Sequence, residues 1–110
     1  MIVVNILRDN NKHICQYSIK GHANFAEHGE DIVCASISIL AQTAILALHE
    51  IAKIDVIYEI SNGWLFCKLP DGLSSKEREQ ANIILDTLYI GVKGTQGMYE
   101  SYIELHDEEV

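Results

Sequence analysis

Residues 31–51 read DIVCASISILAQTAILALHEI, and this stretch decides which kind of fold the chain can adopt. Apolar side chains recur in it at intervals of three, four and seven residues, which is the spacing of one face of an α-helix. That face comprises Ile37, Leu40, Ala41, Ala44, Leu48 and Ile51. Asp31 is expected to be the N-cap, because its carboxylate can accept hydrogen bonds from the N–H groups of the first turn. Cys34 would then be the third helical residue.

The predicted helix is apolar on more than one side. Ile45 and Leu46 lie beside the main face and widen it. The stretch from Ile32 to His49 is nearly uncharged, but polar side chains such as Ser38 interrupt it. We therefore expect a deeply buried helix and no membrane span. A sheet would cover one side of the helix, and a second copy of the chain would cover the other.

Strand and turn signals flank this helix. Short runs rich in β-branched and aromatic residues predict five strands, over residues 2–7, 13–19, 55–60, 64–69 and 99–105. Asn62-Gly63 is a strong hairpin signal between two of them. Ser74 and Glu77 form a capping box that starts a second helix, which is expected to end around residues 91–97. The order ββαββαβ predicts an α+β fold, with two helices packed on a mixed sheet, in a single domain over residues 1–110.

The charge balance narrows the possible partners and the compartment. Sixteen acidic residues against eight Lys and Arg give a formal net charge of −8. Such a surface repels phosphate, so we expect no direct nucleic-acid binding and instead a basic polypeptide partner. The N-terminus lacks the basic start of a signal peptide, and three cysteines without a CxxC pair indicate free thiols. Both observations favour a cytoplasmic protein.

The segment from Gly21 to Cys34 departs from the core-building pattern. It has His22 just after a predicted strand and Cys34 near the predicted start of the helix. Unpaired N–H groups and the helix dipole would lower the pKa of a thiol there, and an adjacent imidazole could protonate a leaving amine. The N–H groups of Cys34 and Ala35 could hold an oxyanion. His28 is a rival base in the same segment, and a buried thiol at this position would be inert.

The same segment resembles a known family. Gly21-His22-Ala23 is followed by Gly29-Glu30-Asp31-Ile32-Val33-Cys34 and then by Ser38, four residues after the cysteine. This pattern resembles the ribosomal-processing cysteine protease family Prp (YsxB-like), and the length and element order are similar over the whole chain. The resemblance implies removal of a short N-terminal extension from large-subunit ribosomal protein twenty-seven, with the cut after an aromatic-rich stretch. It also implies a homodimer.

The resemblance implies roles for individual residues. Cys34 would be the nucleophile, and His22 would be the general base and acid. Asp31 could cap the helix or orient the histidine, two geometrically incompatible roles of which we favour the cap. Ser38 could support the site from beneath, or it could be a helical serine that bonds back to the Cys34 carbonyl. No metal or other cofactor is expected.

Between the histidine and the cysteine lies a loop that is expected to handle the substrate. Gly21 and Gly29 would act as its hinges. The substrate-contacting residues of the loop would be Ala23, Asn24 and Phe25. Phe25 could close over the substrate or dock the loop onto the protein. We expect the free loop to be mobile, so that His22 reaches Cys34 only when substrate orders it.

Two other functions are compatible with these residues. His22, His28 and Cys34 could ligate a metal, although structural zinc sites have tighter spacing and paired cysteines. Alternatively, a non-catalytic module could bind a basic ribosomal protein during ribosome assembly through the same acidic surface. Such a module has no need of a reactive thiol. The other cysteines, Cys15 and Cys67, lie among strand hydrophobes and are expected in the core.

Overall fold

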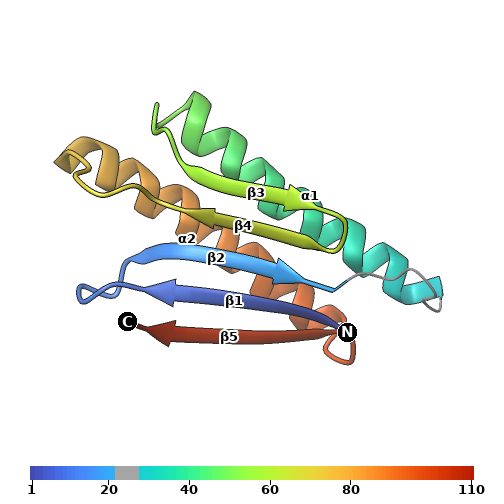
Figure 1. Cartoon of the computed structure of the whole chain (residues 1–110). Helices are drawn as coiled ribbons and strands as arrows, with labels where there is room; N and C mark the ends of the chain where they lie inside the picture. Colours follow the sequence, from blue (N-terminus) through green and yellow to red (C-terminus); the bar gives the residue numbers. More distant parts are fainter. Residues whose placement is uncertain (22–27) are drawn as a thin grey trace.

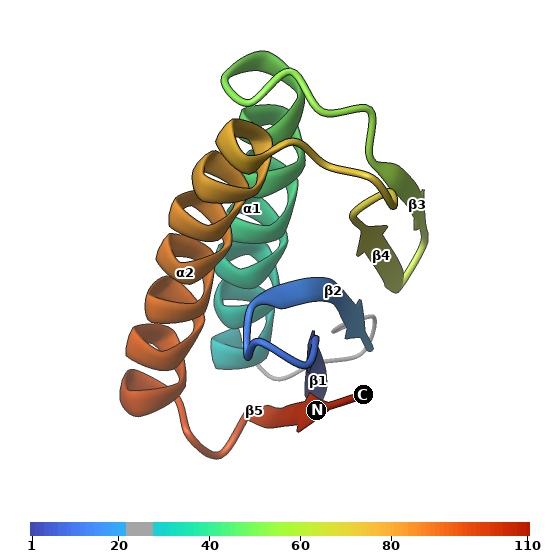
Figure 2. The ribbon, with the colours of Figure 1, turned by 90° about the vertical axis from the view of Figure 1, so that its left-hand side faces the viewer.

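The computed structural model describes residues 1–21 and 28–110, and it confirms the predicted order ββαββαβ (Figure 1). The elements are β1 (Ile2–Arg8), β2 (Ile14–Lys20), α1 (His28–Glu50), β3 (Ile57–Ser61), β4 (Trp64–Lys68), α2 (Ser75–Met98) and β5 (Ile103–Glu109). The five strands form one sheet in the order β3-β4-β2-β1-β5. Only β1 and β5 are parallel, so the sheet is mixed. Both helices pack on the same face of it (Figure 2).

Helix α2 begins as predicted but ends later. Ser74 Oγ accepts a hydrogen bond from the N–H of Glu77, and the Glu77 carboxylate accepts one from the N–H of Ser74. The helix then runs to Met98, beyond the glycines that were expected to end it. The last strand consequently starts at Ile103 and not at Tyr99.

Gly91 explains why a glycine can stand inside α2. A Cβ atom at this position would come within 3.0 Å of the Leu40 side chain in α1. The glycine therefore permits a close approach of the two helices, and it does not mark a helix end.

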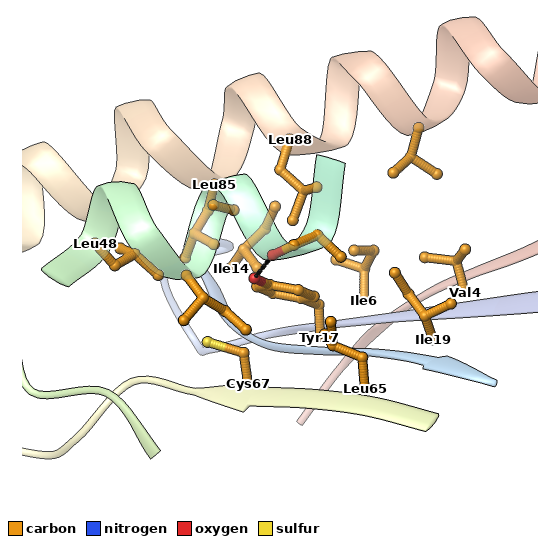
Figure 3. Close-up of a cluster of buried hydrophobic side chains, with 14 of the residues drawn as sticks. Val4, Ile6, Ile14, Tyr17, Ile19, Leu48, Leu65, Cys67, Leu85 and Leu88 are labelled. Carbon is orange, nitrogen blue, oxygen red and sulfur yellow. Dashed lines mark hydrogen bonds between the residues drawn. The ribbon is translucent and has the colours of Figure 1, made fainter. Parts of the chain in front are cut away.

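The hydrophobic core lies between the sheet and the helices (Figure 3). Tyr17 of β2 is fully buried in it, and its hydroxyl donates a 2.8 Å hydrogen bond to the backbone carbonyl of Ala41 in α1. A buried hydroxyl without a partner is costly, so this bond favours one seating of α1 on β2. Cys67 lies in the core as predicted, close to Tyr17 (Figure 3).

The prediction that Cys15 lies in the core was wrong, because β2 contains a β-bulge. Leu7 pairs with Gln16 and Arg8 pairs with Ile14, which leaves Cys15 as the extra residue. Ile14 takes the core position instead and is fully buried. Cys15 is partly exposed, and its Sγ lies 3.4 Å from the Leu7 carbonyl oxygen.

Helix α1 is buried on one side only, which corrects the prediction of a deeply buried helix. Ile37, Ala41 and Leu48 are fully buried. Ile39 and Leu46 are 66% and 57% exposed. Residues 32–50 are long and apolar enough to cross a membrane by length and composition alone, but a third of that stretch is buried within the protein. The described part of the chain thus covers one side of α1 and leaves the other open.

Candidate active site

Cys34 lies one turn deeper in α1 than predicted. The helix begins at His28, so Cys34 is its seventh residue and not its third. Asp31 is the fourth helical residue, and the prediction that it caps the helix was wrong, because an N-cap precedes the first helical residue. Gly29 also belongs to the first turn, so it is helical backbone and not a loop hinge.

This longer helix removes the predicted oxyanion donors. Only the first four N–H groups of an α-helix lack a carbonyl partner within the helix. In α1 these groups belong to residues 28–31, whereas those of Cys34 and Ala35 point to carbonyls one turn earlier. Any hydrogen-bond donors close to Cys34 must therefore come from side chains or from other segments.

Cys34 opens into a cleft between α1 and the β3–β4 hairpin. The cleft has a volume of about 210 Å³. Ile19, Ile60 and Leu65 supply apolar surface, whereas Ser38, Gln42 and Asn62 supply polar groups. Its full lining is Ile19, Gly21, Cys34, Ser38, Gln42 and residues 60–65. A cleft of this character can hold an apolar side chain while leaving hydrogen-bonding groups for a polypeptide backbone.

Ser38 lies in the cleft, and its hydroxyl makes no hydrogen bond within the described part of the chain. Cys34, Ser38 and Gln42 follow one another at four-residue intervals, which places them on one face of α1. In the described part of α1, the hydroxyl of Ser36 donates a hydrogen bond to the Ile32 carbonyl at 2.8 Å, whereas Ser38 makes no such bond. Ser38 therefore presents its hydroxyl to the cleft and does not bond back to Cys34.

Two polar residues of the cleft were not predicted from the sequence. Gln42 could have been found, because its spacing of two helical turns from Cys34 is visible in the sequence. Asn62 could not, because it was interpreted only as a turn residue and reaches the cleft through the pairing of β4 with β2. The hairpin thus supplies the side of the cleft that faces α1, the helix that carries Cys34.

Gly21 joins the end of β2 to the hairpin at the rim of the cleft. Its N–H donates a 3.0 Å hydrogen bond to the Gly63 carbonyl. Its φ of +97° is a conformation that side chains disfavour, and a Cβ atom would collide with the backbone carbonyl of Met1. A glycine is therefore required at this position for both conformation and space.

The two other thiols lie in surroundings that disfavour the thiolate. Burial raises the pKa of Cys67 to about 11. Burial, and next the nearby Asp9 carboxylate, raise the pKa of Cys15. Cys34 is partly exposed, as Cys15 is, and it lines the cleft to which β2, α1, β3 and β4 contribute.

The predicted base, His22, lies outside the described residues, as do the loop residues Ala23, Asn24 and Phe25. The prediction that this loop is mobile concerns the same residues, so it also lies outside the described part of the chain. Of His28 and Asp31 only the backbone is described. Gly21, which immediately precedes His22 in the sequence, lines the cleft that holds Cys34.

Curated proteins are similar to this chain over nearly its whole length. The chain is 27% identical to the ribosomal processing cysteine protease Prp of Bacillus subtilis over 107 residues, which cover 96% of either chain. It is 25% identical over 108 residues to the protein of the same name from Staphylococcus aureus, covering 96% of this chain and 98% of that protein.

Solved structures show the same fold. The processing protease Prp from S. aureus in complex with a substrate peptide is similar with a TM-score of 0.86 at 22% identity, over 97% of this chain and 99% of that chain. The same protease with a covalently linked product peptide has a TM-score of 0.82 at 23% identity, with the same coverage. A family model described as cysteine protease Prp matches residues 1–104. The chain therefore belongs to the Prp family of cysteine proteases.

Proposed function

We propose that this cysteine protease is a processing endopeptidase that removes the short N-terminal extension of large-subunit ribosomal protein twenty-seven, with the cut after an aromatic-rich stretch. The observation that carries the proposal is the exposure of Cys34 in a cleft with both apolar and polar lining. The names of the B. subtilis and S. aureus relatives, which describe ribosomal processing, support this choice of substrate. So do the peptide complexes of the S. aureus protease.

The physical character of the protein suits such a substrate. Ribosomal proteins are basic because they bind RNA, and a net charge of −8 favours their encounter with this enzyme. Ile19, Ile60 and Leu65 give an aromatic side chain an apolar surface to bury against. The electrostatic part of this preference would weaken with added salt.

The proposed reaction follows acyl transfer through a thioester. Cys34 Sγ, as the thiolate, attacks the scissile carbonyl carbon and forms a C–S bond, and the C–N bond then breaks as His22 gives its proton to the leaving amine. Water, deprotonated by His22, attacks the thioester and releases the acid and the thiolate. Since the N–H groups of residues 34 and 35 are committed to the helix, oxyanion stabilisation falls to side-chain donors of the cleft such as Ser38, Gln42 and Asn62.

Cleavage of a peptide that spans the precursor junction tests this proposal. The wild-type protein should cut it after the aromatic stretch, whereas Cys34→Ala and His22→Ala should lose cleavage while keeping the wild-type circular dichroism. Cys15→Ala is the matched control, since this thiol lies at the bulge away from the cleft, and it should cleave normally. Cleavage that survives Cys34→Ala would refute the nucleophile. Binding of the peptide without any cleavage by the wild type would favour the assembly-module alternative.

We further propose that the protein acts in the cytoplasm as a homodimer that covers the open helical face. Ile32, Ile39 and Leu46 of α1 and Ile83 and Ile90 of α2 are exposed and recur at intervals of seven residues. An apolar groove of about 230 Å³ runs between these rows. Two regularly spaced apolar rows on adjacent helices fit the same two helices of a second chain better than they fit a strand or a loop.

A further inference from the structure

Strand β3 is a free edge of the sheet and is exposed throughout. It lies at one end of the strand order, and among the strands of residues 1–21 and 28–110 its single neighbour is β4. All five of its residues are exposed, although three are large and apolar: Ile57 is 53% exposed, Tyr58 57% and Ile60 49%. Exposed apolar residues of this size on an unpaired strand indicate a surface that another chain can cover.

The hairpin register decides which backbone groups of β3 are free. Ser61 and Trp64 flank a two-residue turn and form a hydrogen-bonded pair. In an antiparallel ladder such pairs alternate, so Glu59 also directs its N–H and C=O toward β4. Tyr58 and Ile60 therefore direct theirs away from the sheet, where an added strand would meet them.

The side chains of these same two residues lie on the helix-facing side of the sheet. Tyr58 pairs with Cys67 and Ile60 pairs with Leu65, and both partners are buried beneath the helices. Tyr58 and Ile60 remain exposed, and β3 lies farther from the helices than β2 does (Figure 2). Ile57 lies on the opposite face.

The free edge is continuous with the catalytic cleft. Ile60 and Ser61, at the end of β3, line the cleft that contains Cys34. From there β3 leads away from the cleft toward residue 57 (Figure 1). At about 3.3 Å per residue, the five residues of the strand offer some 16 Å of pairing edge to a chain that enters the cleft.

The edge also lacks the devices that usually prevent strand addition. β3 has neither proline nor a basic residue, and its pairing with β4 is regular, without a bulge. Its one charged residue, Glu59, is acidic, which suits a basic substrate. At the other edge of the sheet β5 carries four acidic residues among its seven. The two edges are thus protected to different degrees, and the less protected one adjoins the nucleophile.

We propose that the substrate peptide binds as a sixth strand on the free edge of β3. Its backbone pairs with the N–H and C=O groups of Tyr58 and Ile60, and its apolar side chains, at every second position, pack on the side chains of these residues. The inference rests on the proposed endopeptidase function, and it adds how the substrate is recognised. The backbone of the substrate pairs with β3, and its aromatic side chains contact the protein at alternate positions.

A matched pair of variants tests whether the peptide contacts the face of β3 that carries Tyr58. Tyr58→Thr removes an exposed side chain on the proposed contact face, outside the lining of the cleft, and Ile57→Thr removes a similarly exposed one on the opposite face. Threonine keeps the strand propensity in both. Tyr58→Thr should weaken binding of the junction peptide to Cys34→Ala protein by about tenfold, as for loss of an aromatic contact, and Ile57→Thr should leave binding unchanged. Equal effects of the two changes would overturn the proposal.

Substrate peptides with one N-methylated backbone amide each test the pairing itself. In an added strand only alternate N–H groups point at β3, so methylation at alternate positions should weaken binding about threefold to tenfold, with little loss at the positions between. Losses without this period of two would contradict strand addition. A change in oligomeric state caused by Tyr58→Thr, without a change in peptide affinity, would assign the edge to a second copy and also overturn it.

The outcomes separate this inference from the function on which it rests. If the wild type cleaves the peptide but N-methylation weakens binding equally at every position, the proposed strand addition is refuted and the endopeptidase function is supported. If the wild type does not cleave but binding shows the alternate pattern, the endopeptidase fails and strand addition stands.

Discussion

At the scale of single residues, burial decides which of the three thiols can react. Cys67 is enclosed in the core beside Tyr17, and Cys15 is held at the bulge of β2. Cys15 and Cys34 are both partly exposed and each lines a pocket, but burial and the nearby Asp9 carboxylate raise the pKa of Cys15. A reactive cysteine must be accessible to the reagent and must be in the thiolate form, and Cys67 is not accessible because it is buried.

Alkylation at pH 8 should therefore modify Cys34 first. With a pKa of about 11, Cys67 is thiolate in about one molecule in a thousand at this pH, and it is also buried. Mass spectrometry after brief iodoacetamide treatment should show one modified site in the folded protein and three in guanidinium chloride. Equal labelling of Cys67 and Cys34 in the folded protein would contradict the described packing.

At the scale of elements, the last strand is fastened to the first by an ion pair. The Arg8 guanidinium donates to both carboxylate oxygens of Asp107, at 2.7 and 3.2 Å, across the parallel β1–β5 pair. This contact joins residues from the two ends of the chain. The hydrogen bond from Arg8 lowers the pKa of the Asp107 carboxyl, although partial burial opposes the shift.

Replacing Asp107 by Asn should lower stability in a pH-dependent way. A carboxyl whose pKa is lower in the folded state stabilises the fold above its unfolded pKa of about 3.9, and this contribution is lost as the pH falls through the folded value. Because the pair is partly exposed, Asp107→Asn should reduce the free energy of unfolding by about 0.5–1 kcal/mol at pH 7. The difference from wild type should shrink below pH 4.

Urea unfolding at several pH values measures this effect. Glu108→Gln, which removes an exposed carboxylate from the same strand, is the matched control and should change little at any pH. A deficit of the Asp107 variant that stayed constant down to pH 2 would mean that the ion pair is not its cause.

At the scale of the whole molecule, the sheet and the helices leave two apolar surfaces open, and we propose a different partner for each. One is the edge of β3 beside the cleft, and the other is the outer face of α1 and α2. The two lie on different sides of α1, because Cys34, Ser38 and Gln42 line the cleft from one side of the helix, whereas Leu40, Ala44 and Ala47 line the groove from the other. Self-association and substrate binding can therefore coexist.

A charge placed on the outer helical face should dissociate the proposed dimer. Ile39→Glu would bring two unpaired carboxylates, one from each protomer, into an apolar contact, so the variant should sediment as a monomer where the wild type sediments as a dimer. Ile57→Glu, an equally drastic change at a similarly exposed isoleucine of β3, should remain dimeric. A wild type that is monomeric at high micromolar concentration would refute this interface.

Much of the fold was predictable because it depends on local patterns. The Ser74 capping box and the Asn62-Gly63 turn were predicted from neighbouring residues and are present as expected. The errors occurred where a distant contact decides the outcome. Helix α2 passes Gly91 because Leu40 of another helix packs there, and β2 bulges at Cys15 so that Ile14 can enter the core.

The sequence by itself determined the element order and the family, and it supplied the prediction that Cys34 is the nucleophile, since periodicity, turn chemistry and a motif at fixed spacing are all properties of short segments. Only the tertiary structure decided what surrounds Cys34. Residues 60–65 reach it through the pairing of β4 with β2, and Gln42 reaches it through the seating of α1 on Tyr17. The physical reason is that a cleft is the space left when elements distant in the chain pack together, and its shape depends on contacts that no single segment contains.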